Sequence, residues 1–252
     1  MEELLLGAFA ELEKSQCCRF ESGKCVATEF GRIASTYYLQ HGTIRSWLEG
    51  SGPEDSPEFV LRLLSLCPEF ADFSFRHNED QESVDLLRQL ENVPMLKSFG
   101  TFMRGVTVGS VHEKVFALML AWIAGVEVEW TDWRVDQAAL LEQLGRVLTG
   151  MIHFYIAKAG VTSVLNSIRA FQMINFSADA DSEFKLTKNG GKIIIKSKSN
   201  INVWLVYVTK DDALVKASRR KIDKEYTEEP PAEASKLTVL PETAGKQFKL
   251  NL

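Results

Sequence analysis

The sequence lacks the patterns that mark membrane-spanning, zinc-binding or disulfide-bonded proteins. Its longest uncharged apolar stretch, Val115 to Val126, is far shorter than the roughly 20 residues that a helix needs to cross a bilayer. The four histidines are scattered, and the four cysteines lie in the first third without C-x-x-C spacing. This spacing favours reduced thiols over a zinc ribbon or a disulfide framework. The acidic N-terminus does not resemble a signal peptide, so we expect a soluble, intracellular protein without membrane contact.

A motif for nucleotide binding and one for nucleophilic catalysis are also missing. The sequence has no phosphate-binding G-x-x-x-x-G-K-[ST] loop and no G-x-S-x-G elbow. The stretch SGKC at 22–25 lacks both the first glycine of that loop and the hydroxyl that holds magnesium. No cysteine or serine has a partner histidine at a recognisable family spacing. We therefore expect no catalytic residue, no metal site and no cofactor.

Charge divides the chain into two unlike parts. Residues 1–180 contain 15 Lys and Arg against 24 Asp and Glu, and residues 181–252 contain 14 against 10. The first part thus has a net charge of −9 and the second +4. A negative net charge opposes binding to nucleic acid, whose affinity comes largely from neutralised phosphates.

Apolar residues recur at three- and four-residue spacing up to about Ile174, which predicts a helical domain. One such stripe consists of Leu140, Leu144, Val147, Met151 and Tyr155. We expect helices over 2–14, 28–40, 43–49, 57–66, 81–91, 111–124, 133–158 and 162–174. Ser56 followed by Pro57 predicts a helix N-cap.

After Ser177 the apolar period changes to two. Six short runs, at 183–187, 192–197, 201–208, 213–218, 235–240 and 246–252, predict strands of a small β-sandwich. KNGG at 188–191 predicts a hairpin turn, as do Ser22 and Gly23 for an earlier hairpin. The Glu- and Pro-rich stretch 225–235 predicts a loop. The fold class is therefore α+β, with a helical bundle followed by a β-sandwich.

The octapeptide FSFRHNED at 73–80 has two interpretations. His77, between Arg76 and the carboxylates of Glu79 and Asp80, could form an acid-base pair. Alternatively, Phe73 and Phe75 anchor a structural turn in the core, while Asn78, Glu79 and Asp80 cap the next helix.

Two surfaces are candidates for nucleic-acid binding. The long helix from about Trp133 carries Arg146 and His153 on a second face, together with Glu142 and Thr149. The basic run VKASRRK at 215–221 contributes Arg219, Arg220 and Lys221 on a strand. The alternative in both cases is a solvated face or strand edge.

The stretches FGRIASTYYLQHGTI (30–44) and LLSLCPEFADFSFRHNED (63–80) resemble the Sec sixty-three, or Brl, domain of two-cassette DExH-box RNA helicases. The family patterns are [FY]-G-R-I-A-S-x-Y-Y-[IL] and, further on, A-x-E-[FY]-x-[DEN]-[LI]-P-[IV]-R-H-[NH]-E-D. The residues that fit are Gly31, Arg32, Ile33, Ala34, Ser35, Tyr37 and Tyr38 in the first pattern, and Glu69, Phe70, Arg76, His77, Asn78, Glu79 and Asp80 in the second. VHEKVFALMLAWIAG, the long helix and the β-rich part are similar to later family segments.

Within this family the similarity is greatest to the C-terminal cassette unit of the spliceosomal U-five particle helicase, followed by the activating-signal-cointegrator helicase. The resemblance implies three domains. Residues 1–28 would be a remnant helix and hairpin of a winged-helix-like segment, 29–176 a helical bundle with a ratchet-type helix, and 177–252 an incomplete immunoglobulin- or fibronectin-like β-sandwich.

Some family features are absent. About seven residues bridge the place where relatives insert a helix-hairpin-helix module, so that module is missing. In translocating relatives the ratchet helix presents an arginine and an aromatic residue, but the matching positions here are Ala139 and Arg146.

The resemblance implies a non-catalytic, nuclear, helicase-associated module that acts as a protein-docking and regulatory platform in pre-mRNA splicing. Its partners would be the helicase core of a parent protein and other spliceosomal proteins, with at most a weak RNA contact. The alternatives are the nucleic-acid-guiding part of an active cassette and a subunit of the cointegrator helicase. The family motifs would have structural roles, and we expect Arg76 and Tyr38 to be buried and hydrogen-bonded.

Overall fold

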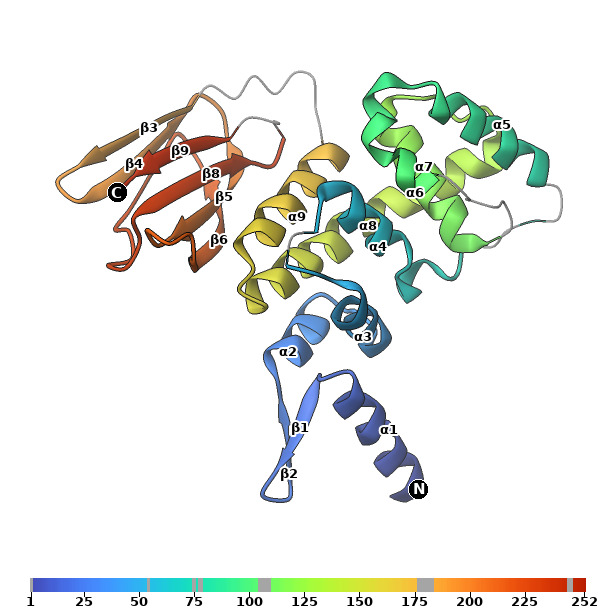
Figure 1. Cartoon of the computed structure of the whole chain (residues 1–252), viewed down its shortest axis with the longest axis horizontal. Helices are drawn as coiled ribbons and strands as arrows, with labels where there is room; N and C mark the ends of the chain where they lie inside the picture. The colour runs from blue at the N-terminus through green and yellow to red at the C-terminus, as the bar shows by residue number, and fades with distance from the viewer. Residues whose placement is uncertain are drawn as a thin grey trace. The chain divides into compact units, whose positions relative to one another are not determined.

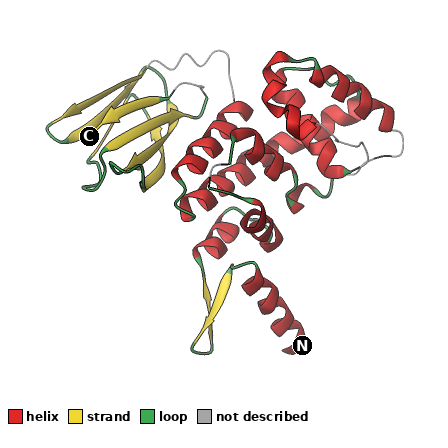
Figure 2. Cartoon of the chain, viewed as in Figure 1, coloured by secondary structure: helices red, strands yellow, loops and turns green. Residues whose placement is uncertain are grey.

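The computed structural model describes residues 2–53, 55–73, 76, 79–103, 110–175, 184–243 and 247–252. Helices make up the N-terminal part and antiparallel sheets the C-terminal part, which confirms the predicted α+β class (Figures 1 and 2). The chain divides into two compact units, Met1–Ala157 and Lys158–Leu252. The last helix therefore clusters with the strands. The division into 1–28, 29–176 and 177–252 stays a prediction.

The N-terminal unit contains helices and one hairpin. Its elements are α1 (Glu2–Lys14), β1 (Cys18–Glu21), β2 (Lys24–Ala27), α2 (Glu29–Thr36), α3 (His41–Gly50), α4 (Pro57–Ser65), η1 (Pro68–Phe70), α5 (Asp80–Glu91), η2 (Pro94–Phe99), α6 (Gly100–Met103), α7 (Val111–Ala124) and α8 (Thr131–Ala157). The predicted helices and the hairpin at Ser22 and Gly23 are confirmed. Residues 37–40, predicted as helical, lie beyond the end of α2, because Tyr38 has a left-handed φ of 51°.

Side chains that cap the helices explain several of these boundaries. The Ser56 hydroxyl accepts a hydrogen bond from the Phe59 backbone N–H, and Pro57 occupies the first helical position, as predicted. Thr28 and Ser110 cap α2 and α7 in the same way. Each cap satisfies a backbone donor that the helix itself cannot pair.

The core of this unit is built around α8. The predicted stripe of Leu140, Leu144, Val147, Met151 and Tyr155 is buried along its whole length. Other fully buried aromatic side chains of the unit are Trp47, Phe70, Phe99, Phe116, Trp133 and Phe154. Among the described residues, no helix combines the length and apolar character needed to cross a bilayer.

The C-terminal unit is a β-sandwich with one helix. Its elements are α9 (Val161–Ile174), β3 (Phe184–Asn189), β4 (Lys192–Ser197), β5 (Ile201–Val208), β6 (Leu214–Ile222), β7 (Glu225–Glu228), β8 (Lys236–Pro241) and β9 (Phe248–Asn251). One sheet has the order β3-β4-β7 and the other β6-β5-β8-β9. Their facing side chains form one core that includes Ile193 and Ile195 from the first sheet and Val203, Leu205 and Val239 from the second.

The opposite face of the four-stranded sheet also carries buried side chains. Trp204 and Val206 alternate with the core residues of β5 and are inaccessible to solvent. α9 contacts β5, and Gln172 Nε2 on α9 donates a 2.5 Å hydrogen bond to the Pro241 carbonyl. α9 thus packs against this sheet. Only residues 175–183 separate α9 from β3, too few for a module of several dozen residues.

One strand was not predicted. β7 lies within the stretch 225–235 that was expected to be a loop, and it pairs with β4 through Tyr226 opposite Ile195 and Glu225 opposite Lys196. Glutamate is uncommon in strands, so the composition of this stretch does not predict one. Glu225 has a partner on the neighbouring strand, Lys196, and Glu228 has one on the other sheet, Tyr207. Glu225 lies 3.0 Å from the Lys196 ammonium.

Candidate functional site

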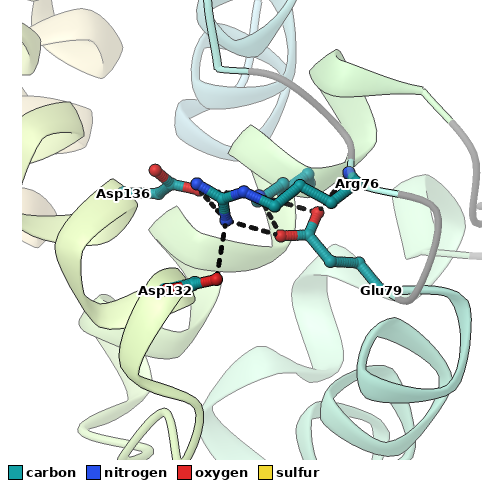
Figure 3. Close-up of polar contacts among 5 residues, drawn as sticks. Arg76, Glu79, Asp132 and Asp136 are labelled. Carbon is teal, nitrogen blue, oxygen red and sulfur yellow. Dashed lines mark hydrogen bonds and ion pairs between the residues drawn. The ribbon is translucent and has the colours of Figure 1, made fainter.

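A partly buried ion network joins the segment before α5 to α7 and to the first turns of α8. The Lys114 ammonium lies 2.8 Å from Glu79 Oε2 and 2.7 Å from Asp136 Oδ2. Figure 3 shows Arg76 directed at the carboxylates of Glu79, Asp132 and Asp136. Its Nη1 atom is 2.9, 3.5 and 3.6 Å from their respective oxygens. We use "ion network" for these five residues.

The network is sheltered from water at its centre. The side chain of Lys114 is fully buried, and that of Glu79 is 5% exposed. The Lys114 ammonium also lies 5.1 Å from the centre of the Trp133 ring, a cation–π distance. Because an unpaired buried charge costs several kcal/mol, the enclosed ions Lys114 and Glu79 depend on their partners.

The surroundings of Glu79 keep it ionised. Burial by itself would raise the pKa of this carboxyl, but the hydrogen bonds from the Lys114 ammonium and from the backbone and side chain of Arg76 outweigh burial. The pKa of Glu79 is therefore below its ordinary value of 4.5. A carboxylate that stays charged at neutral pH serves as an ion partner and not as a proton donor.

The sequence reasoning missed Lys114, Asp132 and Asp136 as members of this site. A signal for Lys114 exists, because it stands directly before the apolar run from Val115 to Ala121, where a charge needs a buried partner. The identity of that partner could not be read locally, since Glu79 is 35 residues away.

Two expectations about the family motifs were wrong. Arg76 is hydrogen-bonded, but its side chain is 46% exposed. Tyr38 is 83% exposed, because its left-handed conformation ends α2 and directs the chain away from it. Glu79 occupies the N-cap position of α5, yet its side chain forms no capping hydrogen bond. Phe75, His77 and Asn78 lie outside the described residues, as does the side chain of Asp80.

The first family motif sits where backbones approach closely. A Cβ atom on Gly31 would lie 1.9 Å from the Cys17 carbonyl oxygen, so no other residue fits without movement. Arg32 pairs with Glu29 at the surface, and Ser35 is exposed. The Tyr37 ring packs 5.3 Å from that of His153 on α8.

The second motif also holds α3. The Glu69 carboxylate accepts hydrogen bonds from the Gln40 backbone N–H, at 2.7 Å, and from the Thr43 hydroxyl, at 2.6 Å. This carboxylate lies at the N-terminus of α3, where the helix dipole favours negative charge.

The candidate nucleic-acid residues are engaged within the fold. Arg146 Nη1 donates to the carbonyls of Tyr37 and Tyr38, at 2.5 and 2.8 Å. These carbonyls lie at the end of α2, so α8 holds that end through Arg146. His153 is half-buried against Tyr37.

The basic run on β6 is engaged as well. Arg219 forms a bidentate pair with the buried Glu242, at 2.5 and 2.7 Å. Arg220 Nε donates to the Tyr226 hydroxyl at 2.8 Å, and Lys221 lies 3.6 Å from Asp223. RNA binding by these residues stays a prediction.

An apolar surface on α1 and the hairpin was not predicted. Leu5, Leu6 and Phe20 have exposed fractions of 55, 62 and 46%, and we name these three residues the apolar patch. Leu5 and Leu6 lie one helical turn before Phe9, whose ring is 5.5 Å from that of Phe20. Val26, 37% exposed, lies on the other face of the hairpin. Beside the patch lies a groove of about 420 Å³ whose lining includes Leu12, Cys17, Cys18, Cys25, Gly31 and Leu39. Such a volume is within the range of binding pockets. Within the part of the chain that the structure describes, no group of three or more His, Cys, Asp or Glu could hold a metal.

Comparison with known proteins gives a family match. The profile of the Sec63 Brl domain matches residues 27–240. The human "Activating signal cointegrator 1 complex subunit 3" is 30% identical over 176 residues, which is 69% of this chain and 8% of that protein.

Two further relatives are helicases by name. "RQC trigger complex helicase SLH1" of Saccharomyces cerevisiae is 28% identical over 174 residues, 69% of this chain and 9% of that protein. "DExH-box ATP-dependent RNA helicase DExH14" of Arabidopsis thaliana is 26% identical over 174 residues, again 69% of this chain and 8% of that protein. The chain thus spans less than a tenth of the length of these curated relatives.

Proposed function

Because the chain belongs to the Sec63 Brl domain family, we propose that it is a non-catalytic, helicase-associated module that docks on protein. Its principal partner would be the ATPase core of a DExH-box helicase, whose activity the module regulates. The named relatives support a helicase setting. The absence of a phosphate-binding loop from the sequence supports a role without ATP turnover.

The apolar patch is the observation that carries this proposal. Three large exposed apolar side chains gather on α1 and β1 around Phe9, and exposed apolar clusters are typical of protein interfaces. All three precede residue 27, where the family match begins. In a longer helicase the patch would belong to the segment that connects this domain to a preceding core, which favours that core as the occupant.

The charges around the patch favour an apolar partner. Lys14 pairs with Glu11, Arg19 with Glu21, and Arg32 with Glu29. Residues 1–32 contain six glutamates against four Lys and Arg, so this segment offers no excess positive charge to a phosphate or to an acidic peptide. The complement of the patch is an apolar surface.

The alternative is that the module guides nucleic acid in an active cassette. This alternative rests on Arg146 and His153, which lie on one face of α8. The basic run on β6 is a second candidate surface for nucleic acid. Because Arg146, Arg219 and Arg220 already bind carbonyls, a carboxylate and a hydroxyl of this chain, phosphate would have to displace these partners. We therefore favour protein docking with, at most, a weak RNA contact.

The proposal also concerns which type of helicase contains this module. The motif resemblance favours a pre-mRNA splicing helicase, with spliceosomal partners and a nuclear location. The cointegrator-type helicase is the second candidate, because that relative has 30% identity to this chain. The two are separated by which helicase core the module binds.

A binding titration tests the docking proposal. The labelled chain is titrated with ATPase cassettes of the splicing-type and cointegrator-type helicases from its own organism. We expect saturable binding to one of them, and we expect Leu5→Ser combined with Leu6→Ser to weaken it about tenfold or more, as at an interface hot spot.

Val135→Ser is the matched control, because Val135 is 63% exposed on α8 and lies outside the apolar patch. It should bind like the parent chain. Equal affinities for the double variant and the parent, or ATP hydrolysis by the purified chain, would contradict the proposal.

A further inference from the structure

Three of the four cysteines line the same groove. Cys17, Cys18 and Cys25 all line the groove beside the apolar patch. In the hairpin, Cys18 pairs with Ala27, and Phe20 pairs with Cys25. Because side chains alternate between the two faces of a strand, Cys18 and Cys25 lie diagonally across the same face.

The two thiols of this diagonal pair differ in accessibility. Cys18 is buried and Cys25 is exposed. Burial, then the neighbouring Cys25 thiol, raises the pKa of Cys18 to about 11. Cys18 thus stays protonated, and the thiol that solvent and oxidants reach first is Cys25.

We propose that Cys18 and Cys25 are a redox-sensitive modification site, at which hydrogen peroxide converts the two thiols into a reversible disulfide. Peroxide first oxidises the Cys25 sulfur to a sulfenic acid and releases water. The Cys18 sulfur then attacks the Cys25 sulfur and gives up its thiol proton as the S–S bond forms. The S–O bond breaks, and the leaving hydroxyl takes this proton and departs as a second water. Two thiols and one peroxide give one disulfide and two waters, so atoms and electrons balance.

The hairpin can accommodate this bond. Diagonal neighbours are about 7–8 Å apart between Cα atoms in a regular sheet, and a disulfide prefers roughly 4.4–6.8 Å. A small closure is therefore required. The β1-β2 ribbon has only two strands and is largely exposed, and two-stranded ribbons tolerate the larger twist that such a closure needs.

The other two cysteines are poorer partners for Cys25. Cys67 is 1% exposed and accepts a hydrogen bond from Trp47 Nε1. Cys17 precedes β1, and its carbonyl is packed against Gly31, which restrains its backbone. The proposal concerns the chemistry of the hairpin and does not depend on the docking function.

Mass spectrometry of the full chain tests the proposal. After treatment with hydrogen peroxide we expect a mass loss of about 2 Da, a Cys18–Cys25 linked peptide, and full reversal by a thiol reductant. Cys25→Ser replaces an exposed side chain and should abolish the cross-link without unfolding the protein. Cys18→Ser should leave Cys25 to gain oxygen, and Cys17→Ser should still form the bond.

Three results would overturn the proposal. They are oxygen addition to Cys25 in the parent chain without a cross-link, a disulfide between Cys17 and Cys25, and a cross-link that persists in Cys18→Ser.

Discussion

The two units use polar side chains in different ways. In the helical unit, the ammonium of Lys114 is enclosed by Glu79 and Asp136. In the sandwich, the Glu228 carboxylate at the junction of the two sheets has three partners: hydrogen bonds from the hydroxyls of Tyr207 and Tyr226, and Arg220 3.8 Å away. In the first arrangement two carboxylates depend on one enclosed cation. In the second, several donors stabilise the charge of one carboxylate. Removing one group should therefore cost more in the helical unit.

The largest effect is expected for Lys114→Met. This change leaves two carboxylates without their buried cation, and we expect a loss of about 3–5 kcal/mol in the free energy of unfolding. Urea unfolding measures the loss, and hydrogen exchange in α7 assigns it to the helical unit. Lys97→Met is the control at an exposed lysine and should be nearly neutral. Equal stability of Lys114→Met and Lys97→Met would contradict the idea that the helical unit depends on one enclosed cation.

The next effect concerns glycines, which also differ between the units. Gly31 is required by contact with the Cys17 carbonyl, whereas Gly190 in the β3-β4 turn has open space and a φ of +55°. We expect Gly31→Ala to destabilise the helical unit by about 3 kcal/mol, since backbone must move to relieve the clash.

Gly145→Ala is the matched control, because Gly145 lies inside α8 and an added Cβ would meet no atom within 4 Å from outside its own helical turn. It should stabilise by about 0.5–1 kcal/mol through helix propensity. A Gly31→Ala protein with the parent's melting temperature would show that close approach does not constrain the first family motif.

A smaller effect is expected in the sandwich. Tyr207→Phe removes one hydrogen bond to Glu228 but leaves the hydrogen bond from Tyr226 and the ion pair with Arg220, so we expect a loss of about 1 kcal/mol. Thermal unfolding, with hydrogen exchange in β5, measures it. A loss of stability as large as that of Lys114→Met would contradict the idea that several donors stabilise the Glu228 carboxylate together.

The smallest effects concern pH. The pKa of Glu79 is lowered in the folded state, so its contribution is present above the ordinary value of 4.5 and is lost as pH falls through the folded pKa. Burial, then the charges of Glu79 and Asp132, raises the pKa of Glu82, so its contribution has the opposite sign and is lost as pH rises.

Melting temperatures from pH 3 to 7 check both signs. Glu79→Gln should flatten the acid limb of the profile and also lower the melting temperature at neutral pH, because Lys114 loses a buried partner. Glu82→Gln should raise the melting temperature relative to the parent at neutral pH, where the parent carries the unfavourable charge. The same profile for both variants would show that the two carboxyls do not have opposed environments.

Local signals explain what could be predicted from the sequence. The bounds of α7, 111–124, and the cap at Ser56 follow from apolar spacing and from residues a few positions apart. The partners of Lys114 and Arg146 could not be predicted, because those of Lys114 lie 22 and 35 residues away in the chain and those of Arg146 more than 100. Tyr38 shows the same limit, since only the folded chain reveals that its aromatic ring is exposed.

The most direct test of the account is an RNA titration, because protein docking and RNA guidance predict opposite results. The anisotropy of labelled single-stranded RNA is followed with the purified chain at 50 and 200 mM salt, concentrations at which phosphate-mediated affinity differs by about 10³–10⁵ for a protein with many phosphate contacts. We predict weak binding that does not saturate and that Arg146→Ala leaves unchanged. Tight binding that falls steeply with salt and is lost in Arg146→Ala would contradict the account.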